Sequence, residues 1–394
     1  MPQFWKKINI SFWLAIGFIL AFLVSPAMAG IVQVTTGSND NTHPSIDNDN
    51  IVWIRNIGGK GQVFLYNLKS KSEVQITSNP VDHFGPMISG NTVVYFDVNE
   101  KIYSYDIVTK VETPILTSGN VELAFVYLSG QRVIWSEGQR SYIFDIPSKT
   151  KTEIAYPQVS FSQGSCQMVL SQISGDNLIS FCESIPEKKT EIYLSNIFTG
   201  KTSLLVTINA IAGDFSFSGH RIAWTDYRNG EYTFNPSSVP MITSRNSDVY
   251  LYDLDTKTET RLTNDQANQS VFEISRDTLW YLDDRTGVAG ELVAYNIPTS
   301  SETRISTTIL DYYQLFPSQA SVSDDKIVFW RKNDAKVQPG SNIFLYSPSI
   351  PEGSPSEVPG QQKPNPTKTD IPAIVSLSGF TIAVFILSIF KRRS

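Results

Sequence analysis

The sequence predicts an all-β fold, a seven-bladed β-propeller closed by an N-terminal strand. Two observations lead to this prediction. A short phrase of sequence recurs seven times at intervals of about 40 to 57 residues, and self-similarity of this period is typical of propellers and solenoids. The repeat region is also rich in Tyr, Phe, Val and Ile, which favour strands.

The recurring phrase is an apolar residue, Ser-Gly, two polar residues and an apolar run that ends in an aromatic ring. The clearest copies are Ile88–Tyr95, Leu128–Trp135 and Phe217–Trp224, and the others are Ile46–Trp53, Ile173–Ile179, Ile274–Tyr281 and Val322–Phe329. A second apolar phrase such as Val249–Asp253 follows each copy, and a third such as Glu259–Thr263 closes most of them. Gly and Asn suit tight turns because they tolerate positive φ.

This pattern predicts four short strands per repeat. The second strand is apolar at consecutive positions, as expected when neighbouring sheets cover both of its faces. Four-stranded sheets stacked radially form a propeller. A β-sandwich would show alternation with one solvated face, and a helical solenoid would show a period of 3.6; the sequence has neither.

The two ends of the repeat region complement each other. The seventh copy ends at Tyr346 without a fourth strand, whereas Ile31–Thr35 precedes the first copy and matches the fourth-strand phrase. We therefore expect the N-terminal strand to complete the last blade and cover an open edge. This favours seven blades over six.

The terminal segments predict export and anchoring. Residues 1–29 resemble a signal peptide, with Lys6 and Lys7, an apolar run and a small-x-small end at Ala27–Ala29; an uncleaved anchor is the alternative. The propeller is expected to span residues 30–347 and a Pro-rich stalk residues 348–372.

Residues 373–390 form an uncharged apolar run that is long enough to cross a bilayer, and the basic residues within 391–394 favour the cytoplasmic side. We therefore expect the propeller on the extracellular face of the cell membrane, held by a single-pass C-terminal helix. The mild acidity, with 38 acidic against 32 basic residues, argues against a nucleic-acid partner.

The two cysteines, Cys166 and Cys182, lie near opposite positions of one predicted hairpin, one or two residues out of register. A β-bulge would bring them within disulfide reach, and export favours oxidation. We predict a disulfide; the alternative is two unpaired thiols.

The segments Ile222–Gly230 and Ser247–Thr263 resemble the TolB-like β-propeller repeats, a WD40-like family found in membrane-anchored surface proteins of archaea. The resemblance extends over residues 30–347. It implies the propeller fold but no single function, since members act as binding platforms, parts of envelope complexes and occasionally enzyme domains.

Aromatic side chains in three unequal loops of one face suggest a ligand-binding rim. Flat rings beside polar groups suit sugars, although the same rings could pack the loops onto the blades. The candidate residues are Tyr227, Arg228, Tyr232, Phe234, Tyr312, Tyr313 and Phe316.

A divalent metal is a weaker candidate. His43, Asp82 and His83 lie in the loops that lead into blades one and two, where some propeller lyases hold a metal, but no metal-binding motif supports them. Residues 226–230 and 283–287 each contain an Asp–Arg pair that we interpret as a hairpin turn, with Ca²⁺ binding as the alternative.

No nucleophile elbow is present. We therefore expect a non-catalytic, cofactor-independent module that binds an envelope polysaccharide or a surface protein. The alternative is an extracellular polysaccharide-active enzyme, a metal-assisted lyase or hydrolase at the channel mouth.

Overall fold

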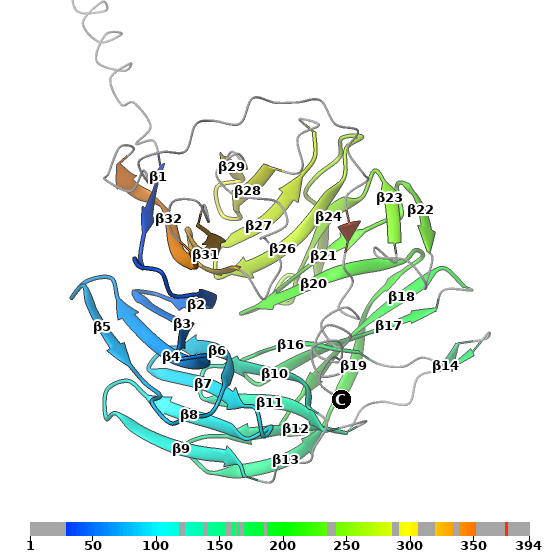
Figure 1. Ribbon diagram of the computed structural model, residues 1–394. Coiled ribbons are helices and arrows are strands. Elements are labelled where there is room, and N and C mark those ends of the chain that lie inside the picture. Colours follow the sequence, from blue (N-terminus) through cyan, green and yellow to red (C-terminus); the bar gives the residue numbers. More distant parts are fainter. Residues whose placement is uncertain are drawn as a thin grey trace, which may run out of the picture.

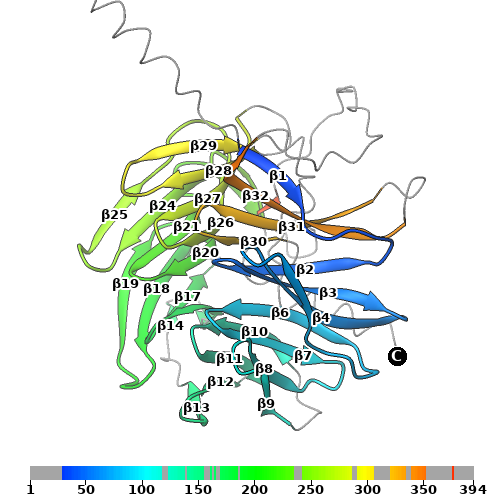
Figure 2. The ribbon, with the colours of Figure 1, turned by 90° about the vertical axis from the view of Figure 1, so that its left-hand side faces the viewer.

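The computed structural model describes residues 29–117, 123–137, 140–154, 160–161, 164–165, 169–184, 187–234, 242–285, 291–305, 320–333, 339–351 and 375–376. Seven four-stranded antiparallel sheets are arranged radially around a common axis (Figures 1 and 2). The prediction of an all-β, seven-bladed propeller is therefore confirmed. The described residues contain no helix that is both long and apolar enough to cross a membrane.

The blades follow the chain, each from an inner to an outer strand. Blade 1 has β2 (Asn41–Asp47), β3 (Asn50–Ile57), β4 (Lys60–Asn67) and β5 (Ser72–Gln75). Blade 2 has β6 (His83–Ser89), β7 (Thr92–Asp97), β8 (Ile102–Asp106) and β9 (Val111–Leu116). Blade 3 has β10 (Leu123–Ser129), β11 (Arg132–Glu137), β12 (Arg140–Asp145) and β13 (Thr150–Ile154). Blade 4 has β16 (Val169–Ser174), β17 (Asn177–Ser184), β18 (Lys189–Asn196) and β19 (Thr202–Ile208).

Blade 5 has β20 (Ala212–Ser218), β21 (Arg221–Asp226), β24 (Asp248–Asp253) and β25 (Thr258–Arg261). Blade 6 has β26 (Gln269–Ser275), β27 (Thr278–Asp283), β28 (Glu291–Asn296) and β29 (Ser301–Ile305). Blade 7 has β30 (Ala320–Ser323), β31 (Lys326–Lys332), β32 (Ser341–Pro351) and, as its outer strand, β1 (Ala29–Gln33). Two small hairpins are inserted: β14 (Ser160–Phe161) with β15 (Gly164–Ser165), and β22 (Glu231–Phe234) with β23 (Ile242–Arg245).

The N-terminal strand completes blade 7, as predicted. Ile31 lies opposite Tyr346 and Val32 opposite Leu345 in an antiparallel pair. β32 extends to Pro351, so the last strand ends inside the segment expected to be stalk. The short strand β33 (Val375–Ser376) pairs with β23. The remaining residues of the predicted signal peptide and membrane span lie outside the described part of the chain.

The core lies between the blades and is built from their second strands. Trp53, Trp135, Trp224 and Trp280 are fully buried there. One apolar cluster joins Phe181 of blade 4 to Trp224 of blade 5, and similar clusters join the other neighbours. Truncating such a ring to alanine typically costs about 3–5 kcal/mol, so the consecutive apolar positions stabilise the stacking of blades.

The Ser-Gly phrase has a role between blades as well as within a turn. The last residue of each inner strand is a serine, except in blade 1, where it is Asp47. At six of the seven blade junctions, all but that of Ser129, its side-chain oxygen accepts the backbone N–H of the turn residue in the next blade. The bonds run from Gly90 to Asp47 (2.6 Å), Gly130 to Ser89 (3.0 Å), Gly219 to Ser174 (2.7 Å), Arg276 to Ser218 (3.2 Å), Asp324 to Ser275 (3.0 Å) and Asn48 to Ser323 (2.9 Å).

These donors all lie in turns with φ between +52° and +60°, a conformation that glycine adopts without cost. The bond from Asn48 of blade 1 to Ser323 of blade 7 crosses the closure point. We call this set of bonds the inter-blade serine ring.

Candidate functional site

The alternation of strands gives the propeller two different faces. Turns between the first and second strands, and between the third and fourth, lie on one face, which we call the turn face. Connections between the second and third strands, and those between blades, lie on the opposite loop face. Ligand sites are most often concave, so hollows of the loop face are candidates.

A cavity of about 380 Å³ opens on the loop face where blades 7, 1 and 2 meet. We call it the blade 7–1–2 cavity. Phe84 and Trp330 contribute aromatic rings, and Asp40, Asn56 and His43 contribute polar groups. The predicted metal ligands His43, Asp82 and His83 all line it.

The structure places the two histidines in strands rather than in loops. His43 lies in β2 at a β-bulge with φ +54°, and its Nδ1 is 3.0 Å from Thr42 Oγ1. Although the His43 side chain is exposed, the protein around the imidazole reduces its hydration and lowers its pKa. This favours the neutral ring, which can both donate and accept hydrogen bonds.

The other two candidates are already engaged in joining blade 1 to blade 2. His83 is buried, and its Nδ1 is 3.1 Å from the carbonyl oxygen of Gly61. Asp82 accepts the Gly61 N–H (2.9 Å) and pairs with Lys60 (3.0 Å). Within the described part of the chain, these three residues are not among the sets whose potential metal ligands lie within 4.8 Å of one another.

Trp330 is the feature of this cavity that sequence reasoning missed. Its Nε1 is buried and has no hydrogen-bond partner among the described residues. The other four described tryptophans all donate from Nε1: Trp53 to Asn41, Trp135 to Glu137, Trp224 to Asp226 and Trp280 to the Asp324 carbonyl. A buried donor without an acceptor costs about 1–3 kcal/mol. The only sequence signal for a special role of Trp330 was that the apolar run Val328-Phe329 continues into one more aromatic residue.

Only two members of the predicted aromatic rim have described side chains, and both make contacts within the protein. Tyr227 is buried, with 1% of its surface exposed, so it packs the loop and offers no open face. Arg228 pairs with Asp226 (2.7 Å) and Glu259 (2.8 Å) and lies over the ring of Tyr250. The side chains of Tyr232 and Phe234, and residues Tyr312, Tyr313 and Phe316, lie outside the described part.

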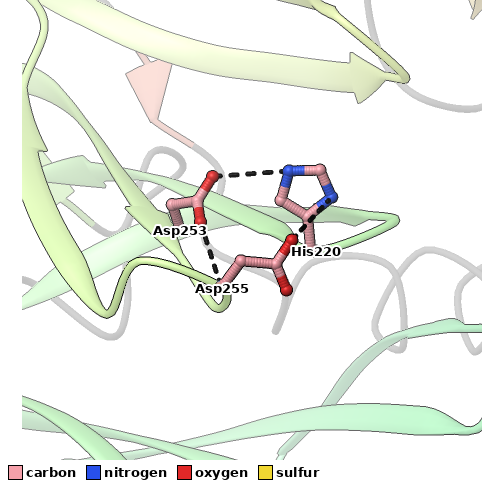
Figure 3. Close-up of side chains that lie close together, drawn as sticks. All are labelled: His220, Asp253 and Asp255. Carbon is pink, nitrogen blue, oxygen red and sulfur yellow. Dashed lines mark hydrogen bonds and ion pairs between the residues drawn. The ribbon is translucent and has the colours of Figure 1, made fainter.

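A cluster of His220, Asp253 and Asp255 lies on the turn face of blade 5 (Figure 3). It is the only set of three potential metal ligands within 4.8 Å of one another among the described residues. The imidazole lies between the carboxylates, with Nε2 3.4 Å from Asp253 and Nδ1 3.9 Å from Asp255. Each carboxylate therefore faces a different ring nitrogen. This arrangement suits contacts between the imidazole and each carboxylate better than the binding of one metal ion by all three side chains.

A structural role explains Asp253 fully. In six blades the residue that ends the third strand accepts the backbone N–H three positions later; these residues are Asn67, Asp106, Asp145, Asn196, Asp253 and Asn296. Hydrogen bonds from the backbone, chiefly that of Thr256, hold the pKa of Asp253 below its usual value. The cluster therefore belongs to a repeated turn.

Two further acidic side chains with raised pKa values were not singled out from the sequence. Burial, and to a lesser degree the charge of Asp214, raises the pKa of Glu183 to about 8. Burial raises the pKa of Glu273 to about 7. Glu273 occupies the position at which blades 1, 5 and 7 have Ser45, Ser216 and Ser321. This departure from the repeat could have identified Glu273 from the sequence. Glu183 follows the apolar run of the second strand β17, which is a weaker sequence signal.

Cys182 is buried in β17 and is disulfide-bonded. Cys166, the other cysteine of the sequence, lies outside the described residues. The pairing of these two cysteines therefore stays a prediction.

Comparison with known proteins identifies the fold and no more. No known protein family and no curated protein matches the sequence. Among solved structures, an oligogalacturonate lyase in complex with manganese is 12% identical with a TM-score of 0.53, over 81% of this chain and 93% of that chain. The β-propeller domain of the Trilobed protease from Pyrococcus furiosus is 14% identical with a TM-score of 0.52, over 79% and 94%.

An acylaminoacyl peptidase from Pyrococcus horikoshii is 12% identical with a TM-score of 0.51. The match covers 80% of this chain but only 53% of the peptidase. At these identities the likeness shows a shared β-propeller fold, which many unrelated functions use.

Proposed function

We propose that this chain is a cell-surface propeller that binds an envelope polysaccharide without cleaving it, and that a sugar unit enters the blade 7–1–2 cavity. The observation that carries the proposal is the buried indole N–H of Trp330, which has no acceptor among the described residues. A sugar hydroxyl or ring oxygen supplies such an acceptor.

The remaining lining of the cavity suits a carbohydrate. Phe84 and Trp330 offer apolar faces for the C–H groups of a sugar ring. The imidazole of His43 and the amide of Asn56 offer hydrogen bonds to hydroxyls. At about 380 Å³ the cavity is near the small end of ligand pockets, so it favours a terminal or branching sugar over a long stretch of chain.

The predicted signal peptide, stalk and C-terminal span support a place outside the cell, and so does the resemblance to TolB-like repeats. Such a position brings the loop face within reach of envelope polymers. The two alternatives are that the ligand is a surface protein and that the chain cleaves the polysaccharide. The experiment below distinguishes both from the proposal.

The proposal is tested with the purified full-length chain in detergent, presented to an array of envelope polysaccharide fragments. Trp330→Phe keeps an aromatic ring but removes the N–H. We expect it to weaken glycan binding at least about tenfold, which corresponds to about 1.4 kcal/mol. Phe198→Ala, at an aromatic ring that is 65% exposed on the turn face, is the matched control and should bind like the wild type.

Equal binding by Trp330→Phe and the wild type would remove the cavity from the proposal. Release of shortened fragments during the incubation would favour the polysaccharide-active enzyme instead. Capture of a surface protein and no glycan would replace the polysaccharide as ligand.

A further inference from the structure

The four most exposed large apolar side chains among the described residues lie toward the turn face of blades 2 and 4. In blade 2, Val108 is 68% exposed and Val111 is 55% exposed. In blade 4, Phe198 is 65% exposed and Leu204 is 50% exposed. Val108 and Phe198 lie in the turns between the third and fourth strands, and the other two lie in the outer strands that follow.

The outer turns of six blades are built alike, so their tips can be compared directly. The tip is the second residue after the Asn or Asp that ends the third strand. In blades 1 to 6 the tips are Lys69, Val108, Pro147, Phe198, Asp255 and Pro298, and all six are exposed. The consecutive blades 2, 3 and 4 have apolar tips, whereas the flanking blades 1 and 5 have charged ones. We call Val108, Pro147 and Phe198 the turn-tip arc.

Hydrogen bonds within the turns hold the arc in place. In each of the three blades the side chain that ends the third strand accepts a backbone N–H at or directly after the tip. The bonds run from Val108 to Asp106 (3.0 Å), from Ser148 to Asp145 (3.0 Å) and from Phe198 to Asn196 (3.2 Å). The guanidinium of Arg132 in blade 3 lies 4.8 Å from the centre of the Phe198 ring. The arc is therefore preorganised, and a contact there orders few additional groups.

A lysine follows each tip of the arc. Lys110 and Lys149 come two residues after the tips of blades 2 and 3, and Lys201 comes three residues after that of blade 4. All three are exposed, and none of them forms an ion pair with another described residue. The nearest acidic groups of these turns are already engaged, since Asp106 and Asp145 accept the backbone of their own turns. The arc therefore combines exposed apolar groups with uncompensated positive charge.

Both ends of the propeller lie on the same face as the arc. Third strands run from the loop face to the turn face, so β32 ends at Pro351 on the turn face, opposite Ala29 of β1. The chain beyond Pro351 contains the apolar run 373–390, which the sequence predicts to span a bilayer. Residues 375–376 pair with β23 in the described structure, and entry of this run into a bilayer requires them to leave that hairpin. An anchor attached here would bring the turn face toward the membrane.

We propose that the turn-tip arc rests on the surface of an anionic lipid bilayer, with the apolar tips entering the boundary between headgroups and acyl chains and the three lysines contacting lipid phosphates. Apolar side chains next to lysines are typical of surfaces that lie in this interface, and each lysine near an anionic surface adds attraction. Three tips bury too little apolar area for stable anchoring. The arc therefore orients a chain that is held by its C-terminal segment, and the loop face with the blade 7–1–2 cavity points away from the membrane.

The test measures how fast a membrane-impermeant maleimide modifies a cysteine beside a tip of the full-length chain. Thr109→Cys and Thr199→Cys place the thiol next to the tips of blades 2 and 4, and Thr256→Cys is the matched control at the equivalent turn position of blade 5. Each variant is compared in detergent and in bilayers of about three parts phosphatidylcholine to one part phosphatidylglycerol. We expect the bilayer to slow the labelling of the first two variants at least about tenfold and that of Thr256→Cys less than about twofold.

The lysines are tested in the Thr199→Cys background. Bilayers of phosphatidylcholine alone, or the double substitution Lys110→Glu and Lys149→Glu, should restore most of the labelling. Equal rates in detergent and in anionic bilayers would overturn the proposal, as would equal protection of Thr256→Cys, which would mean that the bilayer shields the whole turn face. Protection by an acidic surface protein in detergent, with none by the bilayer, would replace the lipid with a protein partner. Trp330→Phe should leave the labelling rates unchanged, so this proposal and the proposed glycan site can fail separately.

Discussion

Glu183 shows at the scale of one residue how burial sets a charge state. It lies in β17, and its Oε1 is buried without a hydrogen-bond partner among the described residues. Its pKa of about 8 means that the carboxyl group is protonated in the folded protein at neutral pH. In the unfolded chain its pKa is near 4.5, so the folded state binds the proton more tightly.

The sign of the pH dependence follows from this difference. Between about pH 4.5 and pH 8 the folded protein holds a proton that the unfolded chain releases, so the free energy of unfolding falls as the pH rises. We expect Glu183→Gln to remove this contribution, up to a few kcal/mol, and to flatten the decline of Tm between pH 5 and pH 9. Glu273 titrates in the same direction, so part of the decline should remain. An unchanged slope for Glu183→Gln, measured by thermal unfolding across this range, would contradict the assignment.

At the scale of the strand, the serine ring joins the inner ends of neighbouring blades. Ser174 accepts the N–H of Gly219 at 2.7 Å, whereas Ser129, at the equivalent position, accepts no such bond from Gly175 in the described structure. Ser174→Ala should therefore lower the free energy of unfolding by about 1 kcal/mol, the usual net value of a hydrogen bond. Ser129→Ala is the natural control and should cost less. Chemical denaturation of both variants measures the difference, and equal losses would mean that the serine acts only within its own turn.

The sequence was sufficient to predict the strands of the blades because the apolar pattern of each strand is local, and the repeat count showed which strand was missing from the last blade. Consecutive apolar positions predicted the second strands, and the unmatched Ile31–Thr35 predicted the pairing that β1 makes with β32. The inter-blade role of the serines was not predicted, because the donor comes from a turn about 40 residues away. His43 was placed in a loop, since nothing in the sequence shows that a bulge holds it inside β2.

The candidate site was predicted less well, for a physical reason. Whether a ring is open to a ligand depends on what the rest of the fold packs against it. Tyr227 is buried and Arg228 is paired, while Trp330 has the unsatisfied donor. An unpaired atom is a property of three-dimensional packing, and composition or spacing does not reveal it.

At the scale of the whole molecule, β1 and β32 meet in blade 7, so both ends of the propeller leave from the same blade (Figure 1). The chain leaves the propeller at the end of β32, in the blade that forms one wall of the blade 7–1–2 cavity, whereas residues 375–376 pair with β23 of the hairpin inserted in blade 5.

The predicted C-terminal anchor can be tested on this whole arrangement. Removing residues 371–394 deletes the uncharged apolar run and its basic tail, the only mature segment that the sequence predicts to span a bilayer. We expect the truncated chain to be released into the medium as a folded protein with a Tm close to that of the full-length chain, because every four-stranded blade lies N-terminal to the cut and β33 is the one described strand that is removed. Removing residues 391–394 alone is the matched control; it spares the apolar run and should leave the protein in the membrane fraction. If the longer truncation stays with the membrane, the anchor is the N-terminal apolar segment, and the predicted signal peptide is not cleaved.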